Sequence, residues 1–546
     1  MDAPAQERHI VDRSTIPGNN TGQQDRAGHS VRLGDILRLA AQRDPRKTAM
    51  IAGDRQIDFA EYDAAANRFA HLLLDARITK GDRIATVLFN SPEYCITHFG
   101  NARAGSVLVH ISPMYAGPEI ARIIERTRPR VLVIDAAVAD KIDAVRDRLT
   151  SVERVIVVSE DGKPGNTAGT SGADFDTAIS GFPATDPAIE IDPADPVAMT
   201  FTGGTTGEPK GALVSHTARF VSAWTTALEH RVTGEDVAGI LTPMFHAVGL
   251  MIWYQATMLA GCTAVIFRKW DAENFIDQAE RHGISSVFMV PVQARDLIRS
   301  PAFDPNRLIA LKNIGAGGAL TPEGLIAECR AALPHCDYTD HYGQSETGVL
   351  TILRPWEAEA HRGSIGRAAT GVDLRIADEN GNQVPPGTIG ELISRGPFMM
   401  EGYFENEVET AAYFRDGWGW SGDLAIADED GFITLVGRSK EMIVSGGINV
   451  YPREIEITFE EHPAVLECTA FGVPDERWGE ALIAYIVLRE GQSADTDTLL
   501  SFCTEQLARY KRPREIVFVA NIPKTPSGKV QKPILRDAYL DGRILP

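Results

Sequence analysis

The chain has 546 residues, of which 44% are hydrophobic and 23% are charged, and its formal net charge is -20. The length predicts two or more domains, and the composition excludes a collagen, a disordered chain and a disulfide scaffold. Because no block of lysine and arginine stands out, nucleic acid is not expected as a partner. Any anionic substrate would have to be bound by a few individual lysine and arginine side chains.

The N-terminus and the cysteines indicate where the protein works. Residues 1–27 are polar and lack the apolar segment of a signal peptide, so they predict a disordered tail. The six cysteines are scattered and form no CxxC pair, which is typical of a reducing compartment. We therefore expect a cytoplasmic protein.

The next part of the chain alternates between strand and helix patterns. Arg55–Asp82 predicts a short strand followed by an amphipathic helix, whose apolar residues recur at helical spacing. Further strand-like runs follow, several of them separated by helical patterns: Ile84–Phe89, Val131–Ile134, Val155–Val158, Val197–Thr202 and Ser286–Val290. This alternation predicts an α/β fold with mixed or mostly parallel sheets.

One segment, Val237–Phe267, contains no Asp, Glu, Lys or Arg and is long enough to suggest a membrane span. Pro243, His246, Gln255 and three glycines interrupt it. A buried strand, loop, helix and strand would explain it as well. We favour a place in the core, with peripheral membrane contact as the alternative.

The pattern changes after about Lys440. The remaining residues predict a helix, two strands, a second helix and a third strand: Pro452–His462, Val465–Val473, Ala481–Leu488, Thr496–Leu507 and Arg514–Val519. Such a unit is large enough for its own core. The predicted division is a tail over 1–27, a large N-terminal domain over 28–439 and a small α+β domain over 440–546.

The stretch TFTGGTTGEPKG, Thr200–Gly211, has the composition of a phosphate loop. Glycines let backbone N–H groups approach phosphate oxygens closely. Thr202, Thr205 and Thr206 add hydroxyl donors, and Lys210 adds a positive charge. From composition alone, a polar hairpin loop is an equal alternative.

It is not a Walker A loop, which needs Gly before the lysine and Ser or Thr after it. Here Pro209 precedes Lys210 and Gly211 follows it. Moreover, Gly211–Ser215 predicts a second strand, whereas a Walker A loop leads into a helix.

TFTGGTTGEPKG instead resembles the phosphate loop of the adenylate-forming superfamily, which includes acyl-CoA and aryl-CoA ligases. Four later stretches resemble further motifs of this family in the same order: DHYGQSE at Asp340–Glu346, SGD at Ser421–Asp423, GRSKEMIVSGGINVYPREIE from Gly437, and PKTPSGK at Pro523–Lys529. The resemblance spans Ile57 to Arg536. It implies a large adenylation domain followed by a small mobile domain.

The resemblance assigns the ATP site. It implies that the loop residues bind the phosphates together with Lys210: Thr202, Gly203, Gly204, Thr205, Thr206 and Gly207. Tyr342 and Gly343 would pack against adenine, as would Gly317 of the GAGGA segment Gly315–Ala319. Ser345 would contact the α-phosphate and Glu346 would bind Mg²⁺, a cation that prefers hard carboxylate ligands. Asp340 stands where the family often has Asn or Gln, which leaves the contact to the adenine amino group open.

The same resemblance assigns residues from the later motifs. Asp423 would accept both ribose hydroxyls, and Arg438 would lie near ribose and phosphate. Lys440 would be the hinge about which the small domain turns, and Lys529 would contact the carboxylate and phosphate during adenylation. The loop lining the pantetheine tunnel would contain Ser445, Gly446 and Gly447. Val444 and Asn449 depart from coumarate-type ligases, so the thioester step would use other groups here.

The implied reaction is an AMP-forming carboxylate–CoA ligation with ATP, Mg²⁺ and CoA. Attack of the carboxylate on the ATP α-phosphate gives acyl-AMP and pyrophosphate, and CoA then takes the acyl group. The resemblance implies that His246 lies at the mouth of the acyl pocket, although a core histidine is the alternative. Small residues in the GAGGA segment and apolar neighbours, namely Phe245, Val248, Val349 and Leu350, favour a medium-chain, alicyclic or aromatic acid.

The sequence leaves three alternatives to this interpretation. The acyl group could pass to a carrier-protein phosphopantetheine; because the chain ends at Pro546 without room for a fused carrier, free CoA is favoured. An α/β hydrolase using Ser345 would need G-x-S-x-G, and the segment here is one residue too long. A non-catalytic nucleotide-binding module would be expected to lack Glu346 or Lys529. The oligomeric state stays open, with a homodimer as one option.

Overall fold

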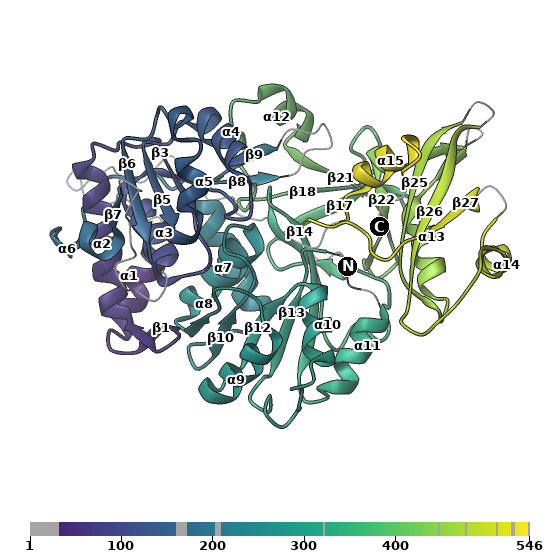
Figure 1. Cartoon of the computed structure of the whole chain (residues 1–546), viewed down its shortest axis with the longest axis horizontal. Helices are drawn as coiled ribbons and strands as arrows, with labels where there is room; N and C mark the ends of the chain where they lie inside the picture. Colours follow the sequence, from purple (N-terminus) through teal and green to yellow (C-terminus); the bar gives the residue numbers. More distant parts are fainter. Residues whose placement is uncertain are drawn as a thin grey trace, which may run out of the picture.

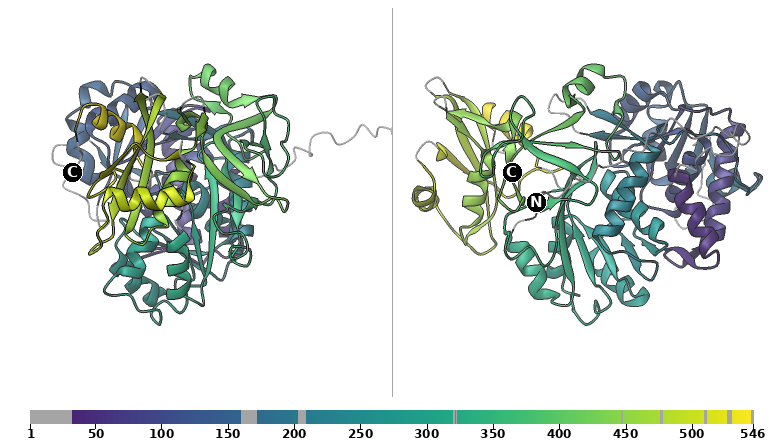
Figure 2. Two further views of the ribbon diagram at one scale, coloured as in Figure 1. Left: turned by 90° about the vertical axis from the view of Figure 1, so that its right-hand side faces the viewer. Right: turned by 180° about the vertical axis from the view of Figure 1, so that it is seen from behind.

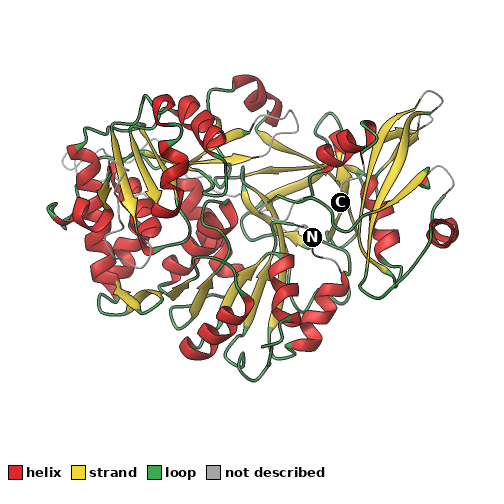
Figure 3. Ribbon diagram, viewed as in Figure 1, coloured by secondary structure: helices red, strands yellow, loops and turns green. Residues whose placement is uncertain are grey.

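The computed structural model describes residues 32–159, 172–202, 209–319, 321, 323–445, 448–475, 478–508, 511–525 and 530–543. Two large sheets flanked by helices form most of the molecule, and a smaller sheet lies between them and a C-terminal unit (Figures 1 and 3). The predicted α/β architecture with a small C-terminal α+β domain is confirmed. The predicted tail 1–27 lies outside the described residues.

The first large sheet has eight strands, and its central strands are parallel. In spatial order they are β19 (Gly402–Tyr403), β9 (Lys210–Ser215), β8 (Pro196–Thr202), β4 (Val107–His110), β3 (Arg83–Val87), β5 (Val131–Asp135), β6 (Arg154–Val158) and β7 (Ala173–Asp174). Strands β8 and β9, which were predicted on either side of the glycine-rich stretch, pair antiparallel.

The second large sheet has nine strands, and it is parallel except at its two ends. In spatial order they are β16 (Arg367–Ala368), β15 (Gly348–Leu353), β14 (Asp337–Gln344), β13 (Asn313–Ala316), β12 (Ser286–Met289), β10 (Val237–Ile240), β11 (Thr263–Ile266), β1 (Thr48–Ala52) and β2 (Arg55–Asp58).

Helices lie between the two sheets and on both outer sides. Helices of the inner layer share one core with residues from both sheets: α1 (Leu33–Arg43), α2 (Phe59–Asp75), α3 (Pro92–Ala104), α7 (His216–Glu229) and α8 (Gln255–Ala260). Outer helices cover the first sheet, namely α4 (Gly117–Thr127) and α5 (Ala139–Asp143), and the second sheet, namely α9 (Ala272–His282), α10 (Pro291–Arg299) and α11 (Glu323–Ala332). The short helix α6 (Phe175–Ser180) packs beside α2.

Alternating side chains explain this layering. On β5, Val131 and Val133 face the inner core, while Leu132 and Ile134 face the outer helices. A strand buried on both faces is a nearly continuous apolar run, which is why the sequence pattern located it.

The charge-free segment Val237–Phe267 is part of this core. It contains β10, a loop, the π-helix η5 (Val248–Tyr254), α8 and β11. Trp253 and Tyr254 are fully buried in it. Across the described ranges, no helix is both long and apolar enough to cross a bilayer.

A five-stranded sheet follows in the chain, formed by β17 (Asp373–Ala377), β18 (Gly390–Arg395), β21 (Trp418–Ala427), β20 (Phe414–Arg415) and β22 (Ile433–Arg438). Helix α12 (Glu407–Tyr413) lies next to β19 and β21. The turn η6 (Ser439–Glu441) then leads from β22 to the C-terminal sheet.

The C-terminal unit lies at one end of the molecule in both views from front and back (Figures 1 and 2). Its strands are β24 (Ile448–Val450), β23 (Ile443–Ser445), β26 (Gly479–Leu488), β25 (Val465–Asp475) and β27 (Glu515–Phe518), and its helices are α13 (Pro452–Glu460), α14 (Thr496–Gln506) and α15 (Lys532–Leu540). Alternate residues of β26 face two separate apolar clusters, so the unit has its own core.

Candidate active site

The parallel strands β13 and β14 end at the same edge of the second sheet, where Ala316 pairs with Asp340. Ligands of open α/β sheets bind at such carboxyl edges. Gly317 follows β13, and a Cβ atom at this position would lie 2.4 Å from Cδ2 of His341. Only glycine therefore lets the chain pass against this ring.

The turn between β14 and β15 carries Glu346, which is only 9% exposed. Tyr403 on β19 donates a hydrogen bond of 2.8 Å to Oε1 of this carboxylate. The backbone N–H of Met400 donates to the carbonyl oxygen of Glu346 at 2.7 Å. Contacts from a distant segment thus fix both the side chain and the backbone of this turn.

Asp423 on β21 is 5% exposed, and three side chains donate to it. Tyr342 and Gln344, on the same face of β14, donate to Oδ2, the second at 2.9 Å, while Nε of Arg438 on β22 lies 2.9 Å from Oδ1. The charge of Asp423 raises the pKa of Arg438. Burial and then the charge of Asp423 hold the pKa of Tyr342 well above its ordinary value, so Tyr342 stays a donor.

Lys210, at the start of β9, forms an ion pair with Glu409 on α12. Its Nζ atom lies 5.2 Å from the centre of the Tyr403 ring. The hydrogen bond from Lys210 lowers the pKa of Glu409. Burial raises the pKa of Tyr403, and the charge of Glu346 raises it further. Tyr403 therefore links the lysine to the carboxylate in the turn.

These contacts bring together residues far apart in the chain. Strand β9, the end of β14, the β14–β15 turn, β19, α12, β21 and β22 each contribute a polar side chain. Buried carboxylates lie beside fixed cations and phenol groups. Such an arrangement can bind sugar hydroxyls, a metal ion and phosphate oxygens at once.

Apolar side chains gather beside the predicted mouth of the acyl pocket. The turn at His246 leads into η5, and a Cβ atom at Gly249 would lie 2.3 Å from the carbonyl oxygen of Pro243, so the turn requires glycine there. Val248, Ile252 and Val349 pack together in one cluster with Ala369 and Val372. The ring of Phe245 lies 4.6 Å from that of His246, centre to centre. Leu350 faces the opposite side of β15 and packs in the main core, so it is separate from this cluster.

The structure places the remaining predicted residues as follows. Thr202 ends β8 and pairs with Lys210 in register, Gly343 and Ser345 lie at the end of β14 and in the following turn, Lys440 lies in η6, and Ser445 ends β23. The other predicted residues lie outside the described residues: Gly203, Gly204, Thr205, Thr206, Gly207, Gly446, Gly447 and Lys529.

Sequence reasoning gave no role to three side chains of this network, Gln344, Tyr403 and Glu409. Gln344 could have been found, because it lies two residues after Tyr342 on one strand and therefore on the same face. Tyr403 and Glu409 contact residues 57 and 199 positions away, and no spacing in the sequence indicates such contacts.

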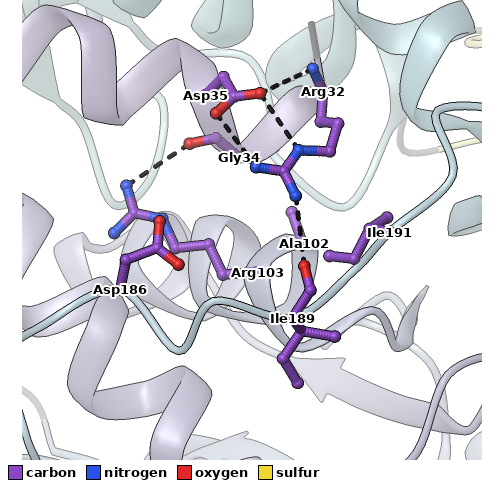
Figure 4. Close-up of a pocket in the computed structure, with 8 residues that line it drawn as sticks. All are labelled: Arg32, Gly34, Asp35, Ala102, Arg103, Asp186, Ile189 and Ile191. Carbon is purple, nitrogen blue, oxygen red and sulfur yellow. Dashed lines mark hydrogen bonds and ion pairs between the residues drawn. The ribbon is translucent and has the colours of Figure 1, made fainter. Parts of the chain in front are cut away.

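A small pocket lies elsewhere, at the start of α1 (Figure 4). It has a volume of about 10 Å³, enough for about one water molecule. Arg32 pairs with Asp35 and Arg103 pairs with Asp63, while Asp186 accepts a hydrogen bond from the backbone N–H of Ala188. These contacts give the charged side chains around the pocket a structural role.

Two family patterns match the chain. The pattern described as AMP-binding enzyme covers residues 37–404, and the pattern described as AMP-binding enzyme C-terminal domain covers residues 454–529. The first alone covers more than half of the chain.

Three relatives illustrate the similarity. The chain is 34% identical to indoleacetate–CoA ligase of Aromatoleum aromaticum, over 90% of this chain and 95% of that one. It is 32% identical to the fatty acid–[acyl-carrier-protein] ligase ScoC of Streptomyces coeruleorubidus, over 91% and 95%. Among solved structures, the anthranilate CoA ligase AuaEII in complex with anthranoyl-AMP matches with a TM-score of 0.83 and 27% identity, over 93% of this chain and 97% of that one.

Proposed function

Because the chain belongs to the AMP-binding enzyme family, we propose that the network around Asp423, Glu346 and Lys210 is its ATP site. The protein is an AMP-forming acid–thiol ligase. It activates a carboxylic acid with ATP to an acyl-AMP and transfers the acyl group to CoA.

The observation that carries the assignment is the convergence of Tyr342, Gln344 and Arg438 on the carboxylate of Asp423. A buried carboxylate held by several donors is fixed in place. Tyr342 and Gln344 use both lone pairs of Oδ2, so one ribose hydroxyl could bond to the remaining lone pair of Oδ1, and the second would replace one of these donors. Tyr342 and Gly317, at the ends of adjacent strands, would hold the adenine ring. A fixed nucleoside aligns the α-phosphate for in-line attack.

Glu346 fits the role of a Mg²⁺ ligand. Tyr403 donates to its Oε1 atom, and nothing among the described residues donates to Oε2, so one hard oxygen is available. Mg²⁺ usually takes one or two protein carboxylates together with substrate phosphates. The described part of the chain accordingly needs no group of three or more His, Cys, Asp or Glu side chains, and it holds none. When bound, Mg²⁺ would neutralise charge on the phosphates.

The first step joins two anions, so positive potential is needed where they meet. A carboxylate oxygen bonds to the α-phosphorus and the bond to pyrophosphate breaks. Lys210 and Arg438 lie in the network, and we assign Lys529 to the same step from its sequence motif. In the second step the CoA sulfur bonds to the acyl carbon and AMP leaves.

The second step would use a rotated C-terminal domain. Strand β22 of the five-stranded sheet ends at Arg438, and β23 of the C-terminal sheet begins at Ile443. Lys440 lies between them, so we place the hinge there. Rotation about such a connection is a common switching mode. The loop at Ser445 would then line the pantetheine tunnel.

The class of acid is proposed from the side chains of the apolar cluster beside η5. Val248, Ile252 and Val349 favour an apolar body, as in medium-chain, alicyclic or aromatic acids. His246 would stand at the mouth of this pocket. One relative is named for indoleacetate and another for fatty acids, which supports this range. The cytoplasmic location and the homodimer stay predictions from the sequence.

The test is mass-spectrometric detection of products from a panel of carboxylic acids with ATP and Mg²⁺, each with and without CoA. Acyl-CoA from a subset of apolar acids would support the proposal. Acyl-AMP that accumulates while CoA goes unused would move the acceptor to a carrier protein, as in the name of one relative. No adenylate from any acid would contradict the proposed site.

A further inference from the structure

Arg219 on α7 is fully buried, and no described residue pairs with it. Its relative exposure is 0%, and its Nε, Nη1 and Nη2 atoms have no hydrogen-bond partner among the described residues. Burial lowers its pKa to about 10, so the group stays charged at neutral pH. A buried charge without a partner is strongly unfavourable, which indicates that something binds it in the working protein.

The charge of Arg219 acts on two buried histidines, His98 and His110, each of which has one ring nitrogen without a partner among the described residues. Nε2 of His98 lies 2.9 Å from Nε2 of Gln255, which donates to it, so the proton of His98 sits on Nδ1. That Nδ1 has no partner among the described residues.

The second histidine, His110, has an unpartnered nitrogen of its own. The hydroxyl of Tyr94 accepts a hydrogen bond from Thr86 and can donate its own proton to Nδ1 of His110, at 2.8 Å. With Tyr94 as that donor, Nε2 of His110 carries the proton, and this Nε2 has no partner within the described ranges. Burial and the nearby charge of Arg219 lower the pKa of His110 to about 3 and that of His98 as well, so both rings are neutral.

Three buried polar groups on three elements, α7, α3 and β4, thus have nitrogen atoms without a hydrogen-bond partner in the described part of the chain. The rings of His98 and His110 lie 6.4 Å apart, centre to centre. Neutral acceptors would satisfy the histidines, but only an anion would also balance the guanidinium charge. The chemistry of this donor cluster, Arg219 with His98 and His110, is that of an anion site.

The donor cluster lies directly behind the proposed active site. His110 pairs in register with Thr200, the first residue of the glycine-rich stretch. A Cβ atom at Gly348 would lie 3.9 Å from Nη2 of Arg219, and Gly348 is two residues after Glu346. Helix α7 also packs against η5, which carries the apolar wall of the proposed acyl pocket.

We propose that Arg219, His98 and His110 bind a carboxylate at the far end of the acid. The preferred substrate would then be a dicarboxylic acid with an apolar body: one carboxylate is adenylated beside Glu346, and the other pairs with Arg219. This inference rests on the proposed function and narrows its substrate class. A free inorganic anion has the same chemistry, and the experiment separates the two sources.

The first arm compares matched acids in ATP–pyrophosphate exchange: straight-chain dicarboxylates against monocarboxylates of equal length, and 4-carboxyphenylacetate against phenylacetate. A site built for a polar group discriminates strongly against the analogue that lacks it, so we expect kcat/KM to favour at least one dicarboxylate by about 100-fold or more. No preference in any pair would overturn the inference and leave the ligase assignment intact.

The second arm uses Arg219→Met, with Arg103→Met as the matched control. Arg103 is also buried, at 6% exposure, but it is paired with Asp63. In Arg219→Met the ratio of kcat/KM for the dicarboxylate to that for the monocarboxylate should fall to a few-fold. The Tm without acid should not fall, because the change removes a charge that has no partner among the described residues. Arg103→Met should lower the Tm and keep the preference. If Arg219→Met lowers kcat/KM equally for both acids and also lowers the Tm, the inference is overturned.

The third arm is the thermal shift of the wild type with dicarboxylate, monocarboxylate, phosphate or chloride, without ATP. A rise in Tm with dicarboxylate that is absent in Arg219→Met supports the inference even if no acid is adenylated, in which case the proposed function fails by itself. A rise with phosphate or chloride and none with any dicarboxylate would assign the donor cluster to a free anion and overturn the inference.

Discussion

The hydroxyl group of Tyr403 lies 2.8 Å from Oε1 of Glu346, so a two-residue strand fixes the carboxylate in the β14–β15 turn. The same ring lies under the ammonium group of Lys210. One phenol therefore touches both a proposed metal ligand and a proposed phosphate ligand. Removal of the Tyr403 hydroxyl should therefore change the kinetics with ATP more than the binding of the acid.

Tyr403→Phe should raise the Mg²⁺ concentration needed for half-maximal adenylation and lower kcat/KM for ATP by about tenfold. A hydrogen bond to a charged group is worth about 1.5–3 kcal/mol, and about 1.4 kcal/mol corresponds to tenfold. Tyr413→Phe is the matched control, because the buried hydroxyl of Tyr413 has no hydrogen-bond partner among the described residues. Equal effects of the two changes would remove Tyr403 from this role.

Asp423→Asn should raise the KM for ATP by about tenfold or more, with a smaller change in the KM for the acid. The change leaves Arg438 without its buried counter-charge and weakens the acceptor proposed for the ribose. Asp373→Asn is the control, because it alters an exposed ion pair with Arg395. Pyrophosphate exchange at varied ATP measures both. An unchanged KM for ATP in Asp423→Asn would contradict the assignment.

Lys529→Ala should lower the rate of acyl-AMP formation by about 100-fold or more, the scale for losing one fixed transition-state donor. It should spare thioester formation from supplied acyl-AMP, since Lys529 would have left the site. Lys524→Ala tests the specificity of the effect, because Lys524 pairs with Glu467 at 2.7 Å within the C-terminal unit. If both half-reactions slow equally in Lys529→Ala, the protein does not alternate between two domain positions as proposed.

Buried histidines should make the protein less stable in acid. Burial lowers the pKa of His230 from 6.5 to about 4, so the unfolded chain binds this proton at a higher pH than the folded one. The contribution of His230 to the free energy of unfolding is therefore fully present above about pH 6.5. It is lost as the pH falls toward 4, by about 1.4 kcal/mol per pH unit. Urea unfolding of wild type and His230→Asn at pH 7.5, 6 and 5 measures the slope. The variant should show the shallower slope, and an identical slope would contradict the prediction.

Much of the fold follows from local patterns. Strands such as β5 are continuous apolar runs, and the strands before and after the glycine-rich stretch could be predicted because each has the spacing of a strand. The ends of helices and strands follow less directly from the sequence. Strands β25 and β26 extend toward each other beyond the predicted ends, to Asp475 and Gly479. Backbone pairing continues there through polar residues, which an apolar pattern does not detect.

Parts of the site depend on packing between distant segments. The order of motifs predicted binding roles for Asp423, Arg438 and Glu346, but not which side chains orient them. The contact between Lys210 and Glu409 joins β9 to α12, and the donor cluster joins α7, α3 and β4. In the sequence, Arg219 and the two histidines are ordinary residues in apolar surroundings. Only the folded core shows that these nitrogen atoms meet no partner among the residues that the structure describes.

The short connection η6 also determines where related proteins could be recombined. The Asp423–Arg438 ladder is complete before it, and Glu441 within it already pairs with Lys532 of α15, at 3.1 Å. A chimera joined after Lys440 would take Asp423 and Arg438 from the N-terminal parent, and Glu441 and Lys532 from the C-terminal parent. Joining between Asp423 and Arg438 would instead combine Asp423 from one parent with Arg438 from the other. The acid preference of such a hybrid should come from the N-terminal parent alone.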